Sequence, residues 1–202
     1  MGIVEDTFTE WTKGLSAEES RVRIFEKIRD IPYYIDPAHF DFEKGPTGTL
    51  EDNRGSCTPK HYIMGVMYGK LGLTVEYCTY GFHWKDQKLD YSKEVMAMAK
   101  KLPVAYHLAC RVFIEGKWIL VDATWDPSLA FAGFPVNIDW DGKSDTTLAV
   151  TPTEDHSCGD IHKRESTFSE KLSAYSLGEK LELSRFTIAL NRWLEDMREK
   201  RE

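Results

Sequence analysis

The chain has 202 residues, of which 42% are apolar, enough for a globular domain that needs no disulfide or metal to hold its core. Its 26 basic and 33 acidic residues leave a net charge of −7, and no basic stripe could supply the phosphate contacts of a nucleic-acid or anionic-membrane surface. We therefore expect one domain over residues 1–202 that binds neither nucleic acid nor membranes.

The first residues and the cysteines bear on cellular location. Residues 1–10 are polar and acidic without an apolar signal region, and no stretch approaches the roughly 18 apolar residues of a membrane span. Four cysteines are too few and too scattered for a disulfide scaffold. We expect a cytoplasmic protein with free thiols, in which Cys78, Cys110 and Cys158 only pack. The oligomeric state cannot be inferred from the sequence.

The first predicted element is a helix that begins after Ser16. Ser16 and Glu19 form a capping-box pattern, and apolar residues recur at helical spacing until Pro32. Residues 33–55 are rich in Pro, Gly, Asp and Thr without periodicity, which predicts a long surface loop. Loops of this length often carry functional residues.

A second helix is predicted over residues 57–71. Pro59 is tolerated in its first turn, and Gly72 is placed as its C-terminal cap. The helix is largely apolar around its circumference, so we expect it to be central. Alternating residues predict a strand over residues 74–82, and residues 90–102 have a helical pattern.

The clearest β unit is a hairpin. Strands are predicted over residues 106–114 and 118–124, and Glu115-Gly116 between them is a turn signal because glycine accepts the positive φ of a tight turn. Beyond Pro127 the chain is irregular as far as Pro152. The last predicted element is a helix from about residue 184 that carries an apolar stripe.

One constellation of residues has the features of a cysteine nucleophile. Cys57 stands at the start of the predicted central helix, while His107 and Asp122 lie on the two strands of the hairpin. The free amides of a helix N-terminus and a nearby imidazolium can lower a thiol pKa from roughly 8.5 to roughly 3.5–7.5. The same amides can stabilise an oxyanion.

The hairpin register determines whether His107 can reach Asp122. If Glu115 and Gly116 are the two turn residues, Asp122 lies opposite Ala109, on the strand face that also carries His107. Such a diagonal pair is roughly 7–8 Å apart. We expect Nδ1–H of His107 to bind the carboxylate and to leave Nε2 for the thiol. A register shifted by one residue would turn Asp122 to the wrong face.

Each member of this constellation also has a structural explanation. Cys57 could be a small buried hydrophobe, His107 a core histidine, and Asp122 a turn cap or a partner of Arg111. Taken singly, each structural explanation is the commoner one. The order and context of the three together favour catalysis.

Residues 31–127 resemble the transglutaminase-like superfamily, a papain-like cysteine fold. The resemblance rests on Arg54-Gly55-Ser56-Cys57 opening a helix, on His107 followed by Val112-Phe113-Ile114-Glu115-Gly116-Lys117-Trp118, and on Val121-Asp122-Ala123-Thr124. It implies an α+β fold whose nucleophile helix packs on an antiparallel sheet. It also implies Cys57 as nucleophile, His107 as base and Asp122 as orienter. Ala109 departs from the pattern, since many relatives have an aromatic residue there.

The resemblance implies acyl transfer on amide bonds through a thioester. The substrate would be a peptide, a protein or a small amide, with hydrolysis as the first expectation and protein-glutamine transglutamination as the second. Alternatives are an arylamine-type acyltransferase, for which no coenzyme A pocket is visible in the sequence, and a binding module that keeps the fold without turnover.

Other residues have weaker claims to a role. Tyr33 or Tyr34 could donate to an oxyanion, as an upstream aromatic donor does in some relatives, although packing is the commoner role. The cluster His156, Cys158 and His162 lacks a fourth zinc ligand. Gly142 and Lys143 break the calcium-loop spacing of the nearby aspartates Asp139, Asp141 and Asp145. We expect no metal and no cofactor.

Overall fold

The computed structural model describes residues 2–199, so Met1 and residues 200–202 of the predicted domain lie outside the description. The helices are α1 Ile3–Thr12, α2 Ala17–Asp30, α3 Gly45–Asp52, α4 Cys57–Lys70, α5 Lys93–Ala99, α6 Ile161–Ser173 and α7 Leu177–Glu199. The strands are β1 Thr74–Phe82, β2 Ala105–Ile114, β3 Lys117–Val121 and β4 Pro152–Gly159. Short 3-10 helices are η1 Pro37–His39, η2 Trp84–Asp86 and η3 Pro127–Ala132.

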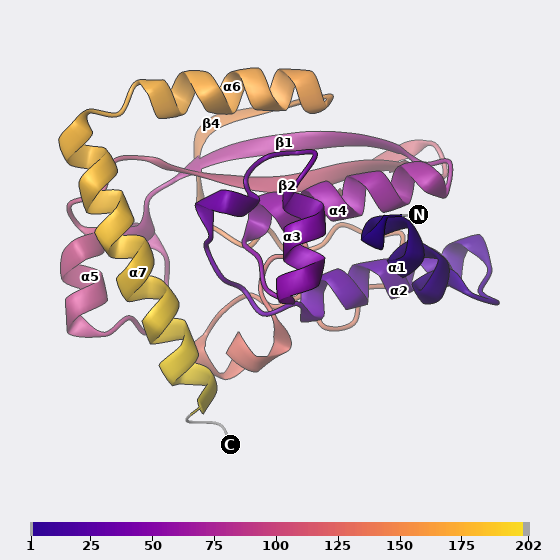
Figure 1. Cartoon of the computed structure of the whole chain (residues 1–202), viewed down its shortest axis with the longest axis horizontal. Helices are drawn as coiled ribbons and strands as arrows, with labels where there is room; N and C mark the ends of the chain where they lie inside the picture. The colour runs from indigo at the N-terminus through magenta and orange to yellow at the C-terminus, as the bar shows by residue number, and fades with distance from the viewer. Residues whose placement is uncertain (1, 200–202) are drawn as a thin grey trace.

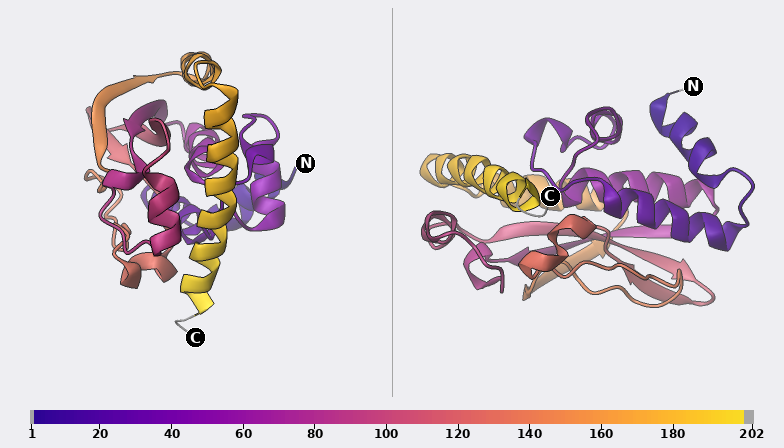
Figure 2. Two further views of the ribbon diagram at one scale, coloured as in Figure 1. Left: turned by 90° about the vertical axis from the view of Figure 1, so that its left-hand side faces the viewer. Right: turned by 90° about the horizontal axis from the view of Figure 1, so that it is seen from below.

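The architecture is a helical layer on an antiparallel sheet, which confirms the predicted α+β class. The sheet has four strands in the order β3-β2-β1-β4 (Figure 1). Helices α2 and α4 form a layer against one face of it (Figure 2). Helix α6 lies along β1 and β4, and α7 descends from it past α5. The helix that begins with Cys57 therefore packs on the sheet, as expected.

Helix α4 is central because almost every side chain on it is apolar or internally bonded. Its buried residues fill the space between α2 and the sheet, among them Ile63, Met64 and Met67. Gly72 follows it with φ of +77°, the left-handed conformation in which glycine has no steric penalty. The predicted helix and its cap are confirmed.

The hairpin register also agrees with the prediction. Glu115 and Gly116 both have positive φ, 49° and 83°, as a type I′ turn requires. Cys110 is then paired with Val121, so Asp122 follows the last residue of β3 on the side of Ala109. The shifted register, which would have turned Asp122 away, is not adopted.

Two hydrophobic clusters make up the core. The first lies between α2, α4 and the sheet and includes Phe25 and Leu108. The second lies beneath α7 and includes Trp125, Phe186 and Leu190. The C-terminal part of the chain therefore contributes buried residues to the core.

Several elements differ from the sequence-based expectation. The predicted loop over residues 33–55 contains η1 and α3, a short glycine-containing helix that packs on α1 and α4. The expected irregular region after Pro127 ends in β4, and α6 follows it. Helix α7 begins at Leu177, about two turns before the expected start. These elements are held by tertiary contacts that a periodicity pattern does not record.

The expectation of free thiols is wrong for two of the four cysteines. Cys78 of β1 and Cys158 of β4 form a disulfide that joins positions 80 residues apart. Cys57 and Cys110 are free. Because disulfides persist mainly in oxidising compartments, the bond also weighs against the cytoplasmic location expected from the cysteine pattern.

No helix within residues 2–199 combines the length and the apolar character that crossing a bilayer requires.

Candidate active site

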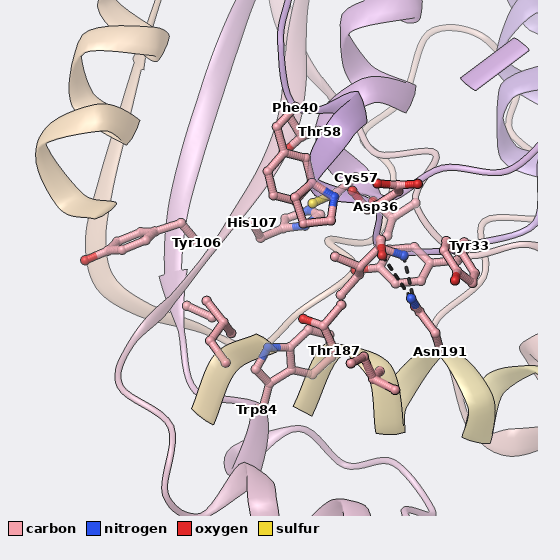
Figure 3. Close-up of a pocket in the computed structure, with 18 of the residues that line it drawn as sticks. Tyr33, Asp36, Phe40, Cys57, Thr58, Trp84, Tyr106, His107, Thr187 and Asn191 are labelled. Carbon is pink, nitrogen blue, oxygen red and sulfur yellow. Dashed lines mark hydrogen bonds between the residues drawn. The ribbon is translucent and has the colours of Figure 1, made fainter. Parts of the chain in front are cut away.

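Cys57 is the first residue of α4, and its side chain reaches a large cavity (Figure 3). The preceding residue, Ser56, makes no side-chain cap to the helix. The N–H groups of Cys57 and Thr58 have no hydrogen-bond partner among residues 2–199. Unpaired amides and the helix dipole both favour negative charge at this position. The thiol therefore lies where a thiolate and an oxyanion would each be stabilised.

His107 and Asp122 form a direct hydrogen bond. His107 Nε2 lies 2.8 Å from Asp122 Oδ2, and both side chains are buried. The carboxylate also accepts from the N–H groups of Ala149 at 2.8 Å and Thr124 at 3.1 Å. Pairing of Asp122 with Arg111, a possibility left open by the sequence, does not occur, because Arg111 pairs with Glu76.

The ring nitrogen that binds the carboxylate is the opposite of the one expected. The sequence-based expectation gave Nδ1 to Asp122, whereas the structure gives Nε2. Nδ1 is thereby the ring nitrogen left for the thiol of Cys57, and the two groups act on each other electrostatically. Cys57 lies beside the imidazole in Figure 3. Pairing register brings the two residues together but does not determine which ring nitrogen faces the carboxylate.

Electrostatics favour an ion pair between Cys57 and His107. Burial by itself would raise the pKa of Cys57, but the charge and hydrogen bond of His107, with the N–H of Leu108, outweigh it and lower that pKa. Burial would lower the pKa of His107, yet Asp122 and Cys57 raise it to about 10. His107 in turn holds the pKa of Asp122 far below its usual range against the effect of burial. The charges therefore favour the pair of thiolate and imidazolium over the neutral thiol and imidazole, with Asp122 ionised beside them.

A second buried histidine, missed in the sequence, ties the helix to the Asp122 segment. Burial lowers the pKa of His61 to about 4, so its ring is neutral. Nδ1–H then donates to the carbonyl of Cys57 at 2.7 Å, and Nε2 accepts from the N–H of Ala123 at 3.1 Å. His61 follows Cys57 by one helical turn, and this i, i+4 spacing is the signal that could have identified it.

Lys60 performs a similar tethering role with its ammonium group. Its Nζ donates to the carbonyls of Arg29 at 3.0 Å, Ile31 at 2.9 Å and Thr124 at 2.7 Å. Burial lowers its pKa to about 7. One side chain thus joins α4 to the end of α2 and to the segment just beyond Asp122.

The cavity at Cys57 has a volume of about 1040 Å³. Its lining includes His107, Thr124, Trp84 and Trp125, while residues of α6 and α7 form another part of its wall. The hydroxyls of Ser56 and Thr124 also line it and are buried without a hydrogen-bond partner. Helices α6 and α7, to which the sequence analysis assigned no function, therefore complete the cavity. The unpaired hydroxyls of Ser56 and Thr124 are available to a polar ligand.

The two tyrosines considered as oxyanion donors differ in their surroundings, although both line the cavity. Tyr33 is buried against Trp125, and burial followed by the charge of Cys57 raises its hydroxyl pKa well above the usual value. The ring of Tyr34 lies under the guanidinium of Arg54, 4.2 Å from ring centre to carbon. Tyr33 therefore has the closer electrostatic link to the thiol.

The structure separates the suspected metal ligands. Cys158 is in the disulfide, and His156 stacks on Tyr80. Asp141 accepts hydrogen bonds from its own loop, and Asp145 accepts from the N–H of Leu120.

Within the described residues, the one group with metal-ligating atoms close together is Asp36, His39 and Asp52, within 4.8 Å of one another. His39 and Asp52 already pair there, with Nε2 and Oδ2 3.3 Å apart. Exposed acidic groups of this kind are common without an ion.

Comparison with known proteins gives little further guidance. No protein-family model matches the chain, and no curated protein matches it. Among solved structures, it is similar to a candidate cysteine protease from Cytophaga hutchinsonii, with 18% sequence identity and a TM-score of 0.42. The match covers 78% of this chain and 48% of that one, so the chain spans about half the length of that relative.

Proposed function

We propose that the protein is a cysteine-dependent acyl-transfer enzyme that acts on amide bonds of a peptide, a protein or a small amide. One observation carries the proposal: a thiol at a helix N-terminus lies beside a histidine that a buried carboxylate holds at 2.8 Å, and both line a large cavity (Figure 3). The residue roles are Cys57 as nucleophile, His107 as acid and base, and Asp122 as orienter.

The chemistry follows from the positions of these groups. The thiolate sulfur attacks the amide carbon, a C–S bond forms, and the carbonyl electron pair moves to an oxygen that the Cys57 N–H can stabilise. His107 then gives its proton to the amine as the C–N bond breaks, which leaves a thioester on Cys57. In the second half of the reaction, the oxygen of a water molecule attacks the thioester while His107 accepts a proton from that water. The C–S bond breaks, and the thiolate returns.

Water is our first choice of acceptor, which makes the enzyme an amidase or peptidase. An amine in place of water would give transglutamination, the second choice. The net charge of −7 gives no reason to prefer a nucleic-acid substrate. An arylamine-type acyltransferase and a non-catalytic binding module are the competing functions that the experiments below separate from this proposal.

Alkylation tests whether Cys57 is activated. The disulfide leaves only Cys57 and Cys110 free, and burial raises the pKa of Cys110 well above the usual value. Iodoacetamide at pH 6 should therefore label Cys57 much faster than Cys110, as read by peptide mass spectrometry. Equal labelling of the two thiols would favour a binding module over an enzyme.

Turnover is tested with a panel of peptide, glutaminyl, arylamine and thioester acyl donors. The wild-type protein should release amine and accumulate an acyl adduct on Cys57, visible in the intact mass, while Cys57→Ala does neither. His107→Gln should slow adduct formation severely, because proton transfer of this kind contributes roughly 10²–10⁴-fold. Turnover that survives in Cys57→Ala would contradict the proposal. Coenzyme A-dependent transfer to an arylamine would favour the acyltransferase instead.

A further inference from the structure

Arg164, on α6, is a buried cation whose nitrogen atoms have no hydrogen-bond partner. Its side chain is 2% exposed, yet Nε, Nη1 and Nη2 all lack a hydrogen-bond partner. No carboxylate within residues 2–199 forms an ion pair with it. Arg198 provides a contrast, because its guanidinium donates hydrogen bonds to Asp126 and to the carbonyl of Tyr33. Arg164 is therefore an exception that its own fold does not explain.

The contacts of Arg164 do not compensate for its burial. The guanidinium lies over the ring of Phe168, with its carbon 4.1 Å from the ring centre. A stacked ring contacts the face of the guanidinium, whereas the N–H groups point outward in its plane and stay unsatisfied. Leaving buried donors unpaired costs free energy, so such a group calls for a partner that arrives from outside the chain.

The position of Arg164 relates it to the candidate active site. Phe168, which it stacks on, lines the cavity that contains Cys57. The thiol of Cys57 and the hydroxyl of Tyr62 both act electrostatically on the guanidinium. A ligand group held by Arg164 would thus lie on the same side of the sheet as the thiol, next to the Phe168 ring.

We propose that Arg164 binds a carboxylate of the amide substrate, which would make it a residue that determines substrate specificity. The inference rests on the proposed function, since it assigns a feature of the substrate whose carbonyl Cys57 attacks. A guanidinium fits a carboxylate in a bidentate geometry.

A carboxylate suits this position better than a phosphate does. The groups that act most strongly on Arg164 besides burial are Tyr62, Cys57 and Glu165, and none of them is a cation that could neutralise a second negative charge. A free peptide C-terminus and an acidic side chain are the two sources of such a carboxylate.

Binding to Cys57→Ala, which cannot turn over, provides the direct test. Three small probes of similar size differ only in the carboxylate: N-acetylglutamine carries a free α-carboxylate, the α-amide of N-acetylglutamate a side-chain carboxylate, and N-acetylglutamine amide neither. We expect at least one acid to bind about tenfold or more tightly than the neutral probe, as charge-assisted hydrogen bonds of typical strength would give. Whichever acid binds identifies the source of the carboxylate.

Two matched variants assign the preference to Arg164. Arg164→Met, in the same Cys57→Ala background, should bind all three probes equally. Arg192→Met removes an exposed arginine that lines the Cys57 cavity and should keep the preference. Arg164→Lys, which keeps the charge but loses the bidentate geometry, should show an intermediate preference and serves if Arg164→Met does not fold.

The melting temperature of Arg164→Met separates a binding role for Arg164 from a structural role, because the two roles predict opposite changes. Replacing an unpaired buried charge with an apolar side chain of similar size should leave the melting temperature unchanged or raise it. If Arg164 only supports the fold, Arg164→Met should instead melt lower and retain whatever probe preference the parent has. That combination would overturn the inference.

The remaining outcomes separate this inference from the proposed function. Equal binding of the three probes to the Cys57→Ala protein, or binding of inorganic phosphate without either acid, would overturn the carboxylate assignment even if the enzyme turns over amides. An Arg164-dependent preference in a protein that shows no turnover would sustain the carboxylate site while the proposed function fails.

Discussion

The side-chain amide of Asn191 binds both backbone polar groups of Ile35. Its Oδ1 accepts from the N–H of Ile35 at 2.9 Å, and its Nδ2 donates to the carbonyl of Ile35 at 2.9 Å (Figure 3). The two residues are 156 positions apart in the chain, and Asn191 is buried. This pair fastens α7 to the segment that follows Tyr33 and Tyr34, so it helps to hold one wall of the cavity to another.

Replacement of Asn191 by Leu should lower the free energy of unfolding by about 1–3 kcal/mol, because it leaves both backbone groups of Ile35 unpaired in a partly buried position. Denaturant unfolding measures the change. Thr187→Val, on the same helix and also lining the cavity, provides a control that keeps the Asn191 bonds. A loss no larger than that of the control would mean that the clamp contributes little to stability.

The pH dependence of alkylation should depend on His107. Its positive charge lowers the pKa of Cys57, so the rate with iodoacetamide in the wild-type protein should rise through an inflection below the ordinary thiol value. In His107→Gln burial is left as the largest influence, and the inflection should move above that value. Stopped-time mass spectrometry gives the profile. His162→Gln, an exposed histidine, is the control, and an unmoved inflection in His107→Gln would contradict the assigned pair.

Turnover should decline on the alkaline side only near pH 10. The pKa of His107 is raised to about 10, so the imidazolium that donates a proton to the leaving amine persists until that pH and is lost above it. The measurement is kcat/KM for any amide substrate found, between pH 5 and 11. A fall centred near pH 6.5, the ordinary value for histidine, would show that Asp122 and Cys57 do not stabilise the protonated ring.

Removal of the disulfide should destabilise the protein by roughly 3–5 kcal/mol, because the bond closes a long loop in the unfolded chain. It joins Cys78 and Cys158 across 80 residues. The double variant Cys78→Ala, Cys158→Ala and the reduced wild-type protein should unfold at similar denaturant concentrations. Reductant should leave the double variant unchanged, and a wild-type protein equally indifferent to reductant would show that the bond does not form.

A stabilising substitution is expected in the hairpin turn. Glu115 has φ of 49°, a left-handed conformation that asparagine tolerates better than glutamate. Glu115→Asn should therefore raise the free energy of unfolding by about 0.5 kcal/mol. Gly116 has φ of 83°, so Gly116→Ala in the same turn should lower it by about 1 kcal/mol. Thermal unfolding of the two variants checks both signs, and the same sign for both would contradict the turn assignment.

Much of the central fold could be predicted because its signals are local. The capping box at Ser16, the glycine after α4 and the turn at Glu115-Gly116 each specify backbone geometry within a few residues, and all three occur as predicted. The hairpin turn also fixed the pairing register, which brought Asp122 within hydrogen-bond distance of His107. The sequence could indicate this pair because a two-residue turn leaves little freedom in the strands that follow.

The C-terminal elements could not be predicted for an equally physical reason. Strand β4 is a polar edge strand, and it shows no apolar alternation because all of its residues are exposed or half-buried. It pairs with β1, and the disulfide between the two strands joins cysteines that are 80 positions apart in the chain. Helix α6 buries one residue, Arg164, and a charged residue does not contribute to the apolar periodicity by which a helix is recognised.

By itself, the sequence determined the helix that begins with Cys57 and the hairpin that places His107 near Asp122, because each follows from short-range geometry. Tertiary structure alone decided which nitrogen of His107 meets the carboxylate, which cysteines pair, that α7 is fastened to Ile35, and that Arg164 is buried without a hydrogen-bond partner. These features depend on contacts between segments that are far apart in the chain, and such contacts do not produce a periodic pattern of apolar residues in either segment.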